Sequence, residues 1–490
     1  MAAALASTGD KGLDDVLGGG LPGNRLYLVQ GQPGVGKTTL ALQFLLEGVR
    51  AGEKVLYITL SETRDELEQV AESHGWSLDG ISLFELSAIE EMVSSDADNS
   101  VFHSSEVELG ETNRALLSLI DKVRPSRAVF DSLSEMRLLA RDALRYRRQI
   151  LSLKQYFAGK NCTVLLLDDQ TSEPGDLQLQ SIAHGVILLE QVPTEYGIDR
   201  RRVRIQKLRG VKFRSGYHDS GIERGGFVVY PRLIAAEHRH SIQEGMISSG
   251  SPSLDTLVGG GIDRGVSTLL LGPAGSGKST LCVRYAVAAA ERGEKAVIYS
   301  FEESPRTIYK RSSAMGMDLR KHVDEGRIKI QHIDPAELTP GEFVSQVRKD
   351  INAGDVSVVV IDSLNGYLNA MPAERFLILQ LHELLSYLGQ LGISSFLVVA
   401  QHGMLGSGMT SPADVSYLAD TVLLFRFYEN DGRIKRAISV VKRRGGIHDD
   451  AIRELRFSTE EGIVVGKVLQ HLRGVLTGVP APNGPLNEND

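Results

Sequence analysis

Short apolar runs alternate with longer amphipathic segments along the first half of the chain. Leu26–Gln30 predicts a buried strand that leads into a glycine-rich loop, Thr38–Ala51 predicts a helix, and Lys54–Leu60 predicts the next strand. Further strands are expected at Ala128–Asp131 and Thr163–Leu167. Because these strands are apolar almost throughout, helices are expected on both faces of the sheet, which is typical of a mainly parallel, doubly wound α/β fold.

The same order of elements returns in the second half of the chain. The corresponding elements are expected at Ser267–Leu271, Ser279–Arg292, Lys295–Phe301, Val356–Ile361 and Ser395–Ala400. The two halves align without a gap from Gly18 with Gly259 to Glu62 with Glu303, at a constant offset of 241 residues (303 − 62). An offset of this length is a whole domain, not a solenoid period. The sequence therefore predicts two homologous domains in tandem, residues 1–240 and 241–478.

Each copy is expected to close with a β-hairpin. In the second copy, Thr421–Tyr428 and Lys435–Lys442 flank a turn at Asp431-Gly432, a dipeptide that favours a tight hairpin. In the first copy, Val186–Glu190 and Arg202–Lys207 flank a longer loop.

The ends of the domains are marked by composition. The segment Pro231–Ser249 is polar and punctuated by glycine, so we expect the domain boundary there. Residues 479–490 contain three prolines and little to bury, and this tail is expected to be disordered.

Composition and charge exclude several classes of protein. Hydrophobic residues make up 42% and charged residues 24% of the 490 positions, which excludes wholesale disorder. The net charge of −8 argues against a general nucleic-acid coat, and no apolar run reaches the length of a membrane span. The cysteines, Cys162 and Cys282, are far apart, which is typical of a protein of the reducing cytoplasm.

Both copies contain a loop of the form G-x-x-x-x-G-K-[ST] between a predicted strand and a predicted helix. Glycines let backbone N–H groups approach phosphates closely, and the lysine adds a positive charge to the β- and γ-phosphates. In the first loop, the residues expected to bind ATP are Gly31, Gly34, Val35, Gly36, Lys37, Thr38 and Thr39. In the second loop, they are Gly272, Gly275, Ser276, Gly277, Lys278, Ser279 and Thr280.

Such a loop also requires an acidic group near the metal. Asp131 and Asp362 each end an apolar strand, where we expect them to orient the water shell of a Mg²⁺ ion held by the hydroxyls of Thr38 and Ser279. A helix N-cap directly after the strand is the alternative role for either aspartate.

A base that polarises an attacking water is expected after the next strand, because strand C-termini line the ligand crevice of a doubly wound sheet. The second copy has Glu302 and Glu303 there, whereas the first has Ser61 and Glu62. Serine cannot act as a base, so the second domain is expected to have the better-equipped catalytic site. For Glu62, a helix cap or a solvated turn is the alternative.

These duplicated motifs resemble those of a RecA-superfamily ATPase and, more narrowly, of the double-domain KaiC family, which is associated with circadian timing and signalling. The resemblance covers about residues 7–478 and includes two basic turns, one in each copy. It implies a hexamer of two stacked rings with Mg-ATP bound between neighbouring subunits. Ser73 matches a family position near the nucleotide. The basic-turn residues implied to reach into the neighbour's site are Lys207, Leu208 and Arg209 in the first ring and Lys442, Arg443 and Arg444 in the second. Ordinary exposed basic strand ends are the alternative for these turns.

The family also transfers phosphate to adjacent serine and threonine residues in its own second domain. Ser416 matches the serine acceptor, whereas Tyr417 replaces the threonine, so the usual two-site cycle is in doubt. Glu302 is then the expected base for the Ser416 hydroxyl. The alternative is that Ser416 merely starts the next strand.

Other functions remain open at this level. A DNA-dependent motor on the same fold would show a basic stripe; the arginines between Arg137 and Arg148 are the nearest approach to one, and an exposed helix face explains them as well. A nucleotide-gated scaffold would bind ATP and a signalling or clock partner with little turnover. Asp168 and Asp169 end a strand and either sense the nucleotide or cap a helix.

Overall fold

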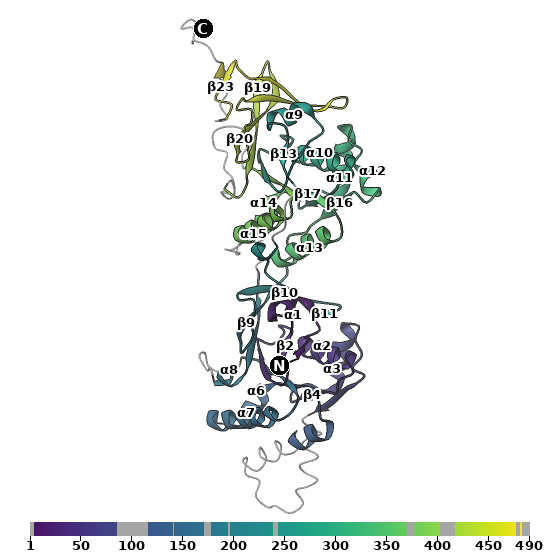
Figure 1. Ribbon diagram of the computed structural model, residues 1–490, viewed down its shortest axis with the longest axis vertical. Helices are drawn as coiled ribbons and strands as arrows, with labels where there is room; N and C mark the ends of the chain where they lie inside the picture. The colour runs from purple at the N-terminus through teal and green to yellow at the C-terminus, as the bar shows by residue number, and fades with distance from the viewer. Residues whose placement is uncertain are drawn as a thin grey trace, which may run out of the picture. The chain divides into compact units, whose positions relative to one another are not determined.

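The computed structural model describes residues 4–85, 116–140, 142–170, 178–194, 197–238, 244–369, 377–401, 417–476 and 481–482 of the 490-residue chain. The chain divides into two compact units, Met1–Arg232 and Leu233–Asp490 (Figure 1). The division falls between Arg232 and Leu233, at the start of the segment in which the sequence marks a boundary.

In the described part of the first unit, one nine-stranded sheet has the order β11-β10-β9-β8-β3-β7-β6-β4-β5. The strands from β8 to β5 in this order are parallel, and β9, β10 and β11 extend the sheet as antiparallel neighbours. Their bounds are β3 (Leu26–Gln30), β4 (Val55–Thr59), β5 (Ile81–Glu85), β6 (Arg127–Asp131), β7 (Thr163–Asp168), β8 (Gly185–Val192), β9 (Arg200–Leu208), β10 (Tyr217–Glu223) and β11 (Gly226–Tyr230).

The second unit repeats this topology over its described residues, with the order β16-β15-β17-β18-β14-β19-β20-β21-β22. Its bounds are β14 (Ser267–Gly272), β15 (Lys295–Ser300), β16 (Ile328–His332), β17 (Val356–Asp362), β18 (Ser394–Ala400), β19 (Thr421–Asn430), β20 (Arg433–Arg443), β21 (Arg453–Ser458) and β22 (Gly462–Val468). Two mainly parallel sheets of the RecA type therefore stand in tandem, as the repeat predicts.

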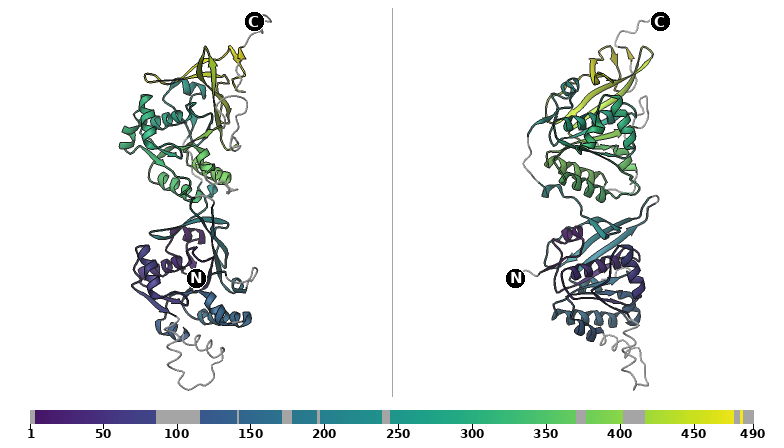
Figure 2. Two further views of the ribbon diagram at one scale, coloured as in Figure 1. Left: turned by 180° about the vertical axis from the view of Figure 1, so that it is seen from behind. Right: turned by 90° about the vertical axis from the view of Figure 1, so that its right-hand side faces the viewer.

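Helices cover both faces of each sheet, as the views in Figures 1 and 2 show. The helices of the first unit include α1 (Lys11–Leu17), α2 (Lys37–Arg50), α3 (Arg64–Ser73), α6 (Leu133–Ala140), α7 (Ala143–Ala158) and α8 (Gln178–Ile182), and residues 116–123 are also helical. Those of the second are α9 (Pro252–Leu257), α10 (Lys278–Glu291), α11 (Pro305–Ala314), α12 (Leu319–Asp324), α13 (Pro340–Asn352), α14 (Leu364–Asn369) and α15 (Leu377–Gln390). Within the described residues, no helix combines the length and the apolar character that crossing a membrane would need.

The apolar strands are explained by the two-sided burial of the sheet. In β3, Tyr27 and Val29 pack into the core on one face, and Leu26 and Leu28 pack into the core on the other. Because successive side chains of a strand point to opposite faces, a strand covered on both sides is expected to carry apolar residues at successive positions.

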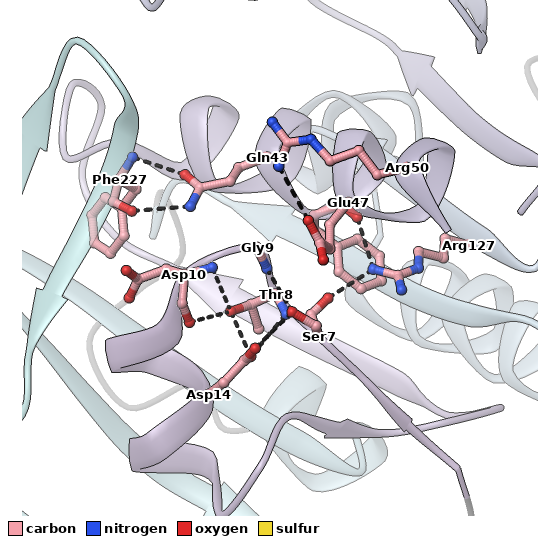
Figure 3. A network of polar contacts seen from close by, with 11 residues as sticks. Ser7, Thr8, Gly9, Asp10, Asp14, Gln43, Glu47, Arg50, Arg127 and Phe227 are labelled. Atoms are coloured by element: carbon pink, nitrogen blue, oxygen red, sulfur yellow. Dashed lines mark hydrogen bonds and ion pairs between the residues drawn. The ribbon is translucent and has the colours of Figure 1, made fainter. Parts of the chain in front are cut away.

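A buried arginine ties the start of the chain to the first core (Figure 3). Arg127, which is 4% exposed, donates to Glu53 Oε2 at 2.7 Å, to the carbonyl of Ser7 at 2.7 Å and to the carbonyl of Phe44 at 2.9 Å. Asp14 accepts hydrogen bonds from Ser7 Oγ and from the backbone N–H of Thr8. These contacts hold the N-terminal segment against α2 and β6.

The strands and helices expected from the apolar pattern are present with ends that differ by one or two residues. The Asp431-Gly432 turn is confirmed, with positive φ angles of 53° and 65°. The outer hairpins β10–β11 and β21–β22 were not predicted, because strands such as β10 carry polar residues on a partly exposed sheet end. Ala481–Pro482, inside the tail expected to be disordered, pairs with Leu472–Arg473, and the other residues of that tail lie outside the described part of the chain.

Candidate functional site

The first glycine loop joins β3 to α2. Gly34 and Gly36 have φ angles of 83° and 103°, a backbone conformation that residues other than glycine rarely adopt. Gly36 is also the N-cap residue of α2 and supplies no side-chain cap, so N–H groups of the first helical turn remain directed into the loop. This is the arrangement by which a helix N-terminus binds phosphate.

Lys37 lies at the centre of this loop and is buried, with 6% of its surface exposed. Its ammonium group donates to the carbonyl oxygens of Gly31 at 2.8 Å and Gln32 at 2.9 Å. It also forms an ion pair of 2.7 Å with Oδ1 of Asp169, which follows β7. The lysine is therefore fixed by the loop itself and by one carboxylate.

The expected metal residues of the first unit lie together. Thr38 Oγ1 donates to Asp131 Oδ2 at 3.0 Å, and the hydroxyl of Tyr57 donates to the same oxygen. Burial raises the pKa of Asp131, and the hydrogen bonds from Tyr57 and Thr38 oppose that rise. These oxygens suit Mg²⁺, which is usually held by one or two protein groups, phosphate oxygens and water. Among the described residues, no three acidic, histidine or cysteine side chains form a metal-binding cluster. A Mg²⁺ site of this kind does not need one.

Glu62 follows β4 at the same edge of the sheet. Its backbone N–H donates to Thr59 Oγ1, and Thr59 Oγ1 donates back to its carbonyl, so the turn is fixed. Its Oε2 atom is buried without a hydrogen-bond partner among the described residues. Burial, and next the negative charge of Asp131, raise the pKa of Glu62 to about 7. A carboxyl group with this pKa is suited to accept a proton near neutral pH.

The second glycine loop, between β14 and α10, repeats much of this geometry. Lys278 donates to the carbonyl oxygens of Gly272 at 2.8 Å and Pro273 at 2.7 Å, and burial lowers the pKa of Lys278 to about 8. Burial raises the pKa of Asp362 to about 6, against a hydrogen bond from Ser279 that lowers it. The pair formed by Ser279 and Asp362 thus corresponds to Thr38 and Asp131.

The glutamates of the second unit have different partners from Glu62. Glu303, which corresponds to Glu62 at the offset of 241 (303 − 62), forms an ion pair with Arg311 of α11. Glu302 accepts a hydrogen bond from Ser363 Oγ. Both carboxylates are therefore held by side chains, whereas Glu62 retains an unpartnered oxygen.

The basic turn of the first unit begins level with the middle of β3, before that strand reaches the phosphate loop. Lys207 pairs in register with Val186, which pairs with Leu28, and the N–H of Arg209 bonds the carbonyl of His184, which precedes β8. The phosphate loop follows Gln30, the last residue of β3, whereas Lys207 is level with Leu28, the middle residue of that strand. The second unit has the same register, because Lys442 pairs with Val422, which pairs with Leu269 near the start of β14.

The cations around the first basic turn bind backbone carbonyls. Lys207 donates to Gln180 and Ala183, Arg209 to Ser181, Lys154 to Ile182, and Arg25 to Arg209. Burial, and next the charge of Arg209, lower the pKa values of Lys154 and Lys207. Across the described residues, no aspartate or glutamate forms an ion pair with any of these four cations, so the turn presents concentrated positive charge.

The second basic turn is partly neutralised. Lys442 donates to the carbonyl of Ala419, while Arg444 forms an ion pair with Asp420 at 3.2 Å and Arg443 one with Asp263 at 3.3 Å.

Three further predicted residues have mixed outcomes. Ser73 is exposed and its hydroxyl donates to the carbonyl of Val70, while the adjacent His74 approaches Thr39 Oγ1 at 3.5 Å. Ser416 lies outside the described residues. Tyr417 is 55% exposed, and its carbonyl accepts a hydrogen bond from Arg444.

Arg436 of β20 lies at the second phosphate loop but was not predicted from the sequence. Its guanidinium lies over the rings of Phe427 and Phe457 and donates to the carbonyl of Gly275 in the second phosphate loop, at 3.3 Å. No local motif marks Arg436; only the pairing of β20 with β19 brings it to the loop.

The chain is similar to known proteins along most of its length. A family model described as "ATPase: KaiC" matches residues 6–234 and again 247–470. The Circadian clock protein KaiC3 of Synechocystis is 26% identical over 480 residues, covering 96% of this chain and 94% of the relative. The Circadian clock oscillator protein KaiC of Acaryochloris marina is 27% identical over 479 residues and that of Picosynechococcus 28% identical over 480 residues, covering 96% of this chain and 90% and 91% of the relatives.

Proposed function

Because the chain belongs to the KaiC ATPase family, we propose that it binds Mg-ATP at both phosphate loops and hydrolyses it in a ring of identical subunits. The proposal extends to a role in circadian timing or signalling, which the names of its relatives suggest. It takes residues 1–240 and 241–478 as the two ATPase domains.

One observation carries this proposal: in each unit, strand pairing sets the lysine of the basic turn level with an earlier residue of the strand that leads into the phosphate loop. The loop follows the last residue of β3 or β14, whereas the lysine of the turn is level with the third residue of that strand. Transfer of a phosphoryl group requires positive charge close to the phosphates. A second copy of the chain, arranged head to tail, supplies that charge, and such interfaces close into rings.

The side chains of the first unit divide the work at its site. Lys37 and the N–H groups of the loop bind the phosphates, while Thr38 and Asp131 hold Mg²⁺, which when bound neutralises phosphate charge. Glu62 accepts the proton of the attacking water, for which its pKa of about 7 is suited. Arg209 and Lys207 of a neighbouring copy stabilise the charge that develops on the phosphates.

In the second unit, we assign the base to Glu302, because Arg311 already neutralises Glu303. Glu302 and the acceptor Ser416 make serine autophosphorylation part of the proposal, with ATP bound by a neighbouring subunit as the donor. The second unit has Glu302 where the first has Ser61, and serine cannot act as a base, so the second site is the better equipped for catalysis. The unpartnered oxygen of Glu62 supports turnover at the first site as well.

We further propose a hexamer that acts in the cytoplasm and binds a signalling or clock partner. The free, buried thiols of Cys162 and Cys282 are compatible with a reducing compartment. Binding of DNA is not part of the proposal. The basic stretch that suggested DNA binding includes Arg137, and Arg137 forms an ion pair with buried Asp168.

The direct test is to measure particle mass with ATP and with ADP, together with phosphate release at each protein concentration. We expect ATP-dependent rings and a turnover per chain that rises as rings form. Turnover of the same size in a lone monomer would overturn the shared-site proposal, and stimulation by single-stranded DNA would favour the DNA-dependent alternative. Stable rings with negligible phosphate release would instead indicate a nucleotide-gated scaffold.

A further inference from the structure

We propose that Asp169 competes with the phosphates of the nucleotide for Lys37, and so weakens nucleotide binding at the first site relative to the second. This inference rests on the proposed function, because it assumes that both loops bind a nucleoside polyphosphate. It concerns a residue that is neither in the loop motif nor in the basic turns.

Counting the hydrogen-bond donors of Lys37 gives the first argument. A lysine ammonium group has three N–H donors. Those of Lys37 face the carbonyl oxygens of Gly31 at 2.8 Å and Gln32 at 2.9 Å, and the carboxylate of Asp169 at 2.7 Å. A phosphate oxygen that binds this ammonium must therefore displace one of the three acceptors.

Asp169 is the acceptor that phosphate is expected to displace. Gly31 and Gln32 are parts of the loop backbone, whereas Asp169 contacts the lysine through a side chain at the end of β7 and is 24% exposed. Its other oxygen accepts a hydrogen bond from Ser134 Oγ at 3.1 Å, at the start of α6. This bond gives the carboxylate a defined place beside the loop, where its negative charge repels a phosphate until the side chain moves.

The second unit provides a comparison within the same chain. In the first sheet, Gln30 pairs with Asp168, so Asp169 is level with Gly31, the first glycine of the loop. In the second sheet, the corresponding glycine, Gly272, pairs with Ala400. Ala400 therefore occupies the position of Asp169, and a methyl group cannot accept a hydrogen bond. Throughout the described part of the chain, no carboxylate forms an ion pair with Lys278, whose described acceptors are the two loop carbonyls.

The test measures binding of a fluorescent ATP analogue to the full-length chain with one site inactivated. In a Lys278→Ala background, which leaves the first site, Asp169→Asn removes the charge at nearly constant shape and Asp169→Ala removes the acceptor. We expect both variants to bind the analogue about tenfold more tightly than the background chain, the effect of one charge-assisted hydrogen bond that no longer competes.

The reciprocal variant tests the same physics at the second site. In a Lys37→Ala background, Ala400→Asp is expected to weaken binding of the analogue about tenfold, because it places a carboxylate beside Lys278. Ala400→Asn is its matched control, since it adds similar volume without charge and is expected to weaken binding less. Circular dichroism of each variant establishes that the fold is kept.

The outcomes separate this inference from the proposed function. If the Lys278→Ala chain binds the analogue but the Asp169 variants bind it equally or more weakly, the inference is overturned and the nucleotide site stands. If folded chains with Asp169, asparagine or alanine at this position all fail to bind the analogue, the proposed function of the first loop fails with it.

Discussion

The hydroxyl of Thr38 donates to Asp131 Oδ2 at 3.0 Å. Thr38 directly follows the loop lysine, and Asp131 ends β6, which lies two strands from β3 in the sheet. Among the described residues, the side chains of Thr38 and Tyr57 donate hydrogen bonds to Asp131, and α6 begins at Leu133. The aspartate thus faces the phosphate loop, as its expected role beside Mg²⁺ requires. The equivalent pair, Ser279 and Asp362, occurs in the second unit.

Replacing Asp131 with asparagine is expected to weaken the use of Mg²⁺ at the first site. In the Lys278→Ala background, phosphate release should fall about a hundredfold and require more Mg²⁺ for half-maximal rate, because the carboxylate no longer orients the metal's water shell. A magnesium titration of phosphate release measures both effects. The matched control is Asp121→Asn, which alters an exposed ion pair with Lys160 and should leave the titration unchanged.

Hydrolysis at the first site should depend on pH through Glu62. Burial raises the pKa of Glu62 to about 7, and only the ionised form accepts a proton, so the rate should be highest above pH 7 and fall as the pH drops through 7. Glu62→Gln should reduce the rate about a hundredfold and remove this acidic limb. The profile of phosphate release between pH 5.5 and 9, in the Lys278→Ala background, checks both (these limits are about 1.5 to 2 units either side of the pKa). A limb that survives in Glu62→Gln would assign the base to another group.

Sites shared between subunits predict complementation between two inactive chains. A Lys37→Ala chain lacks the loop lysine, and a Lys207→Ala chain lacks the cation supplied to its neighbour. Rings assembled from equal amounts of both should recover roughly a quarter of the first-site activity, because a random ring pairs an intact loop with an intact neighbour at that frequency. Phosphate release before and after mixing, with the second site inactivated in both chains, is the measurement. Recovery is not expected if Lys207 acts within its own chain.

Arg127 should contribute strongly to the stability of the first unit. Its removal in Arg127→Met leaves two buried carbonyls and Glu53 without their donor, at a cost of about 3 kcal/mol in the free energy of unfolding. Urea denaturation followed by circular dichroism measures the change. The control is Arg50→Ala, which removes an exposed ion pair with Glu47 near the same network and should cost less than about 0.5 kcal/mol. Equal effects of the two substitutions would contradict the assignment.

Autophosphorylation is predicted at Ser416. Incubation with ATP labelled on the γ-phosphate should place label on a peptide that contains residues 411–421, and Ser416→Ala should remove it. Glu302→Gln should reduce the labelling, because the serine hydroxyl then lacks its base. Tyr417→Phe is the matched control, and label that disappears in this variant alone would assign the acceptor to the tyrosine. An active preparation without label on this peptide would contradict the prediction.

Local sequence was sufficient to predict the phosphate loops and most of the sheet. Gly34 and Gly36 need a backbone that only glycine adopts readily, so their spacing before Lys37 already specifies the loop. The buried strands have runs of successive apolar residues, such as Leu26–Val29 in β3, because both of their faces are covered, and that pattern is visible without coordinates. The repeat at constant offset predicted the second domain by the same reasoning.

The partners of the charged residues could not be predicted in this way. Glu62 and Glu303 occupy equivalent turns, yet Arg311 neutralises only the second, because the residue at the matching position of α3 in the first unit is Val70. Asp169 was open to two interpretations until the pairing of β3 with β7 placed it beside Lys37.

The sequence by itself determined which groups form each glycine loop, because the glycines, a lysine and a helix start are contiguous in the chain. Only the tertiary structure decided which charges meet. The order and register of the strands set Lys207 level with Leu28, before the loop of its unit, and Arg436 beside the loop of its unit. Strand order and register come from pairing and packing between segments far apart in the chain, and no local pattern of residue types contains that information.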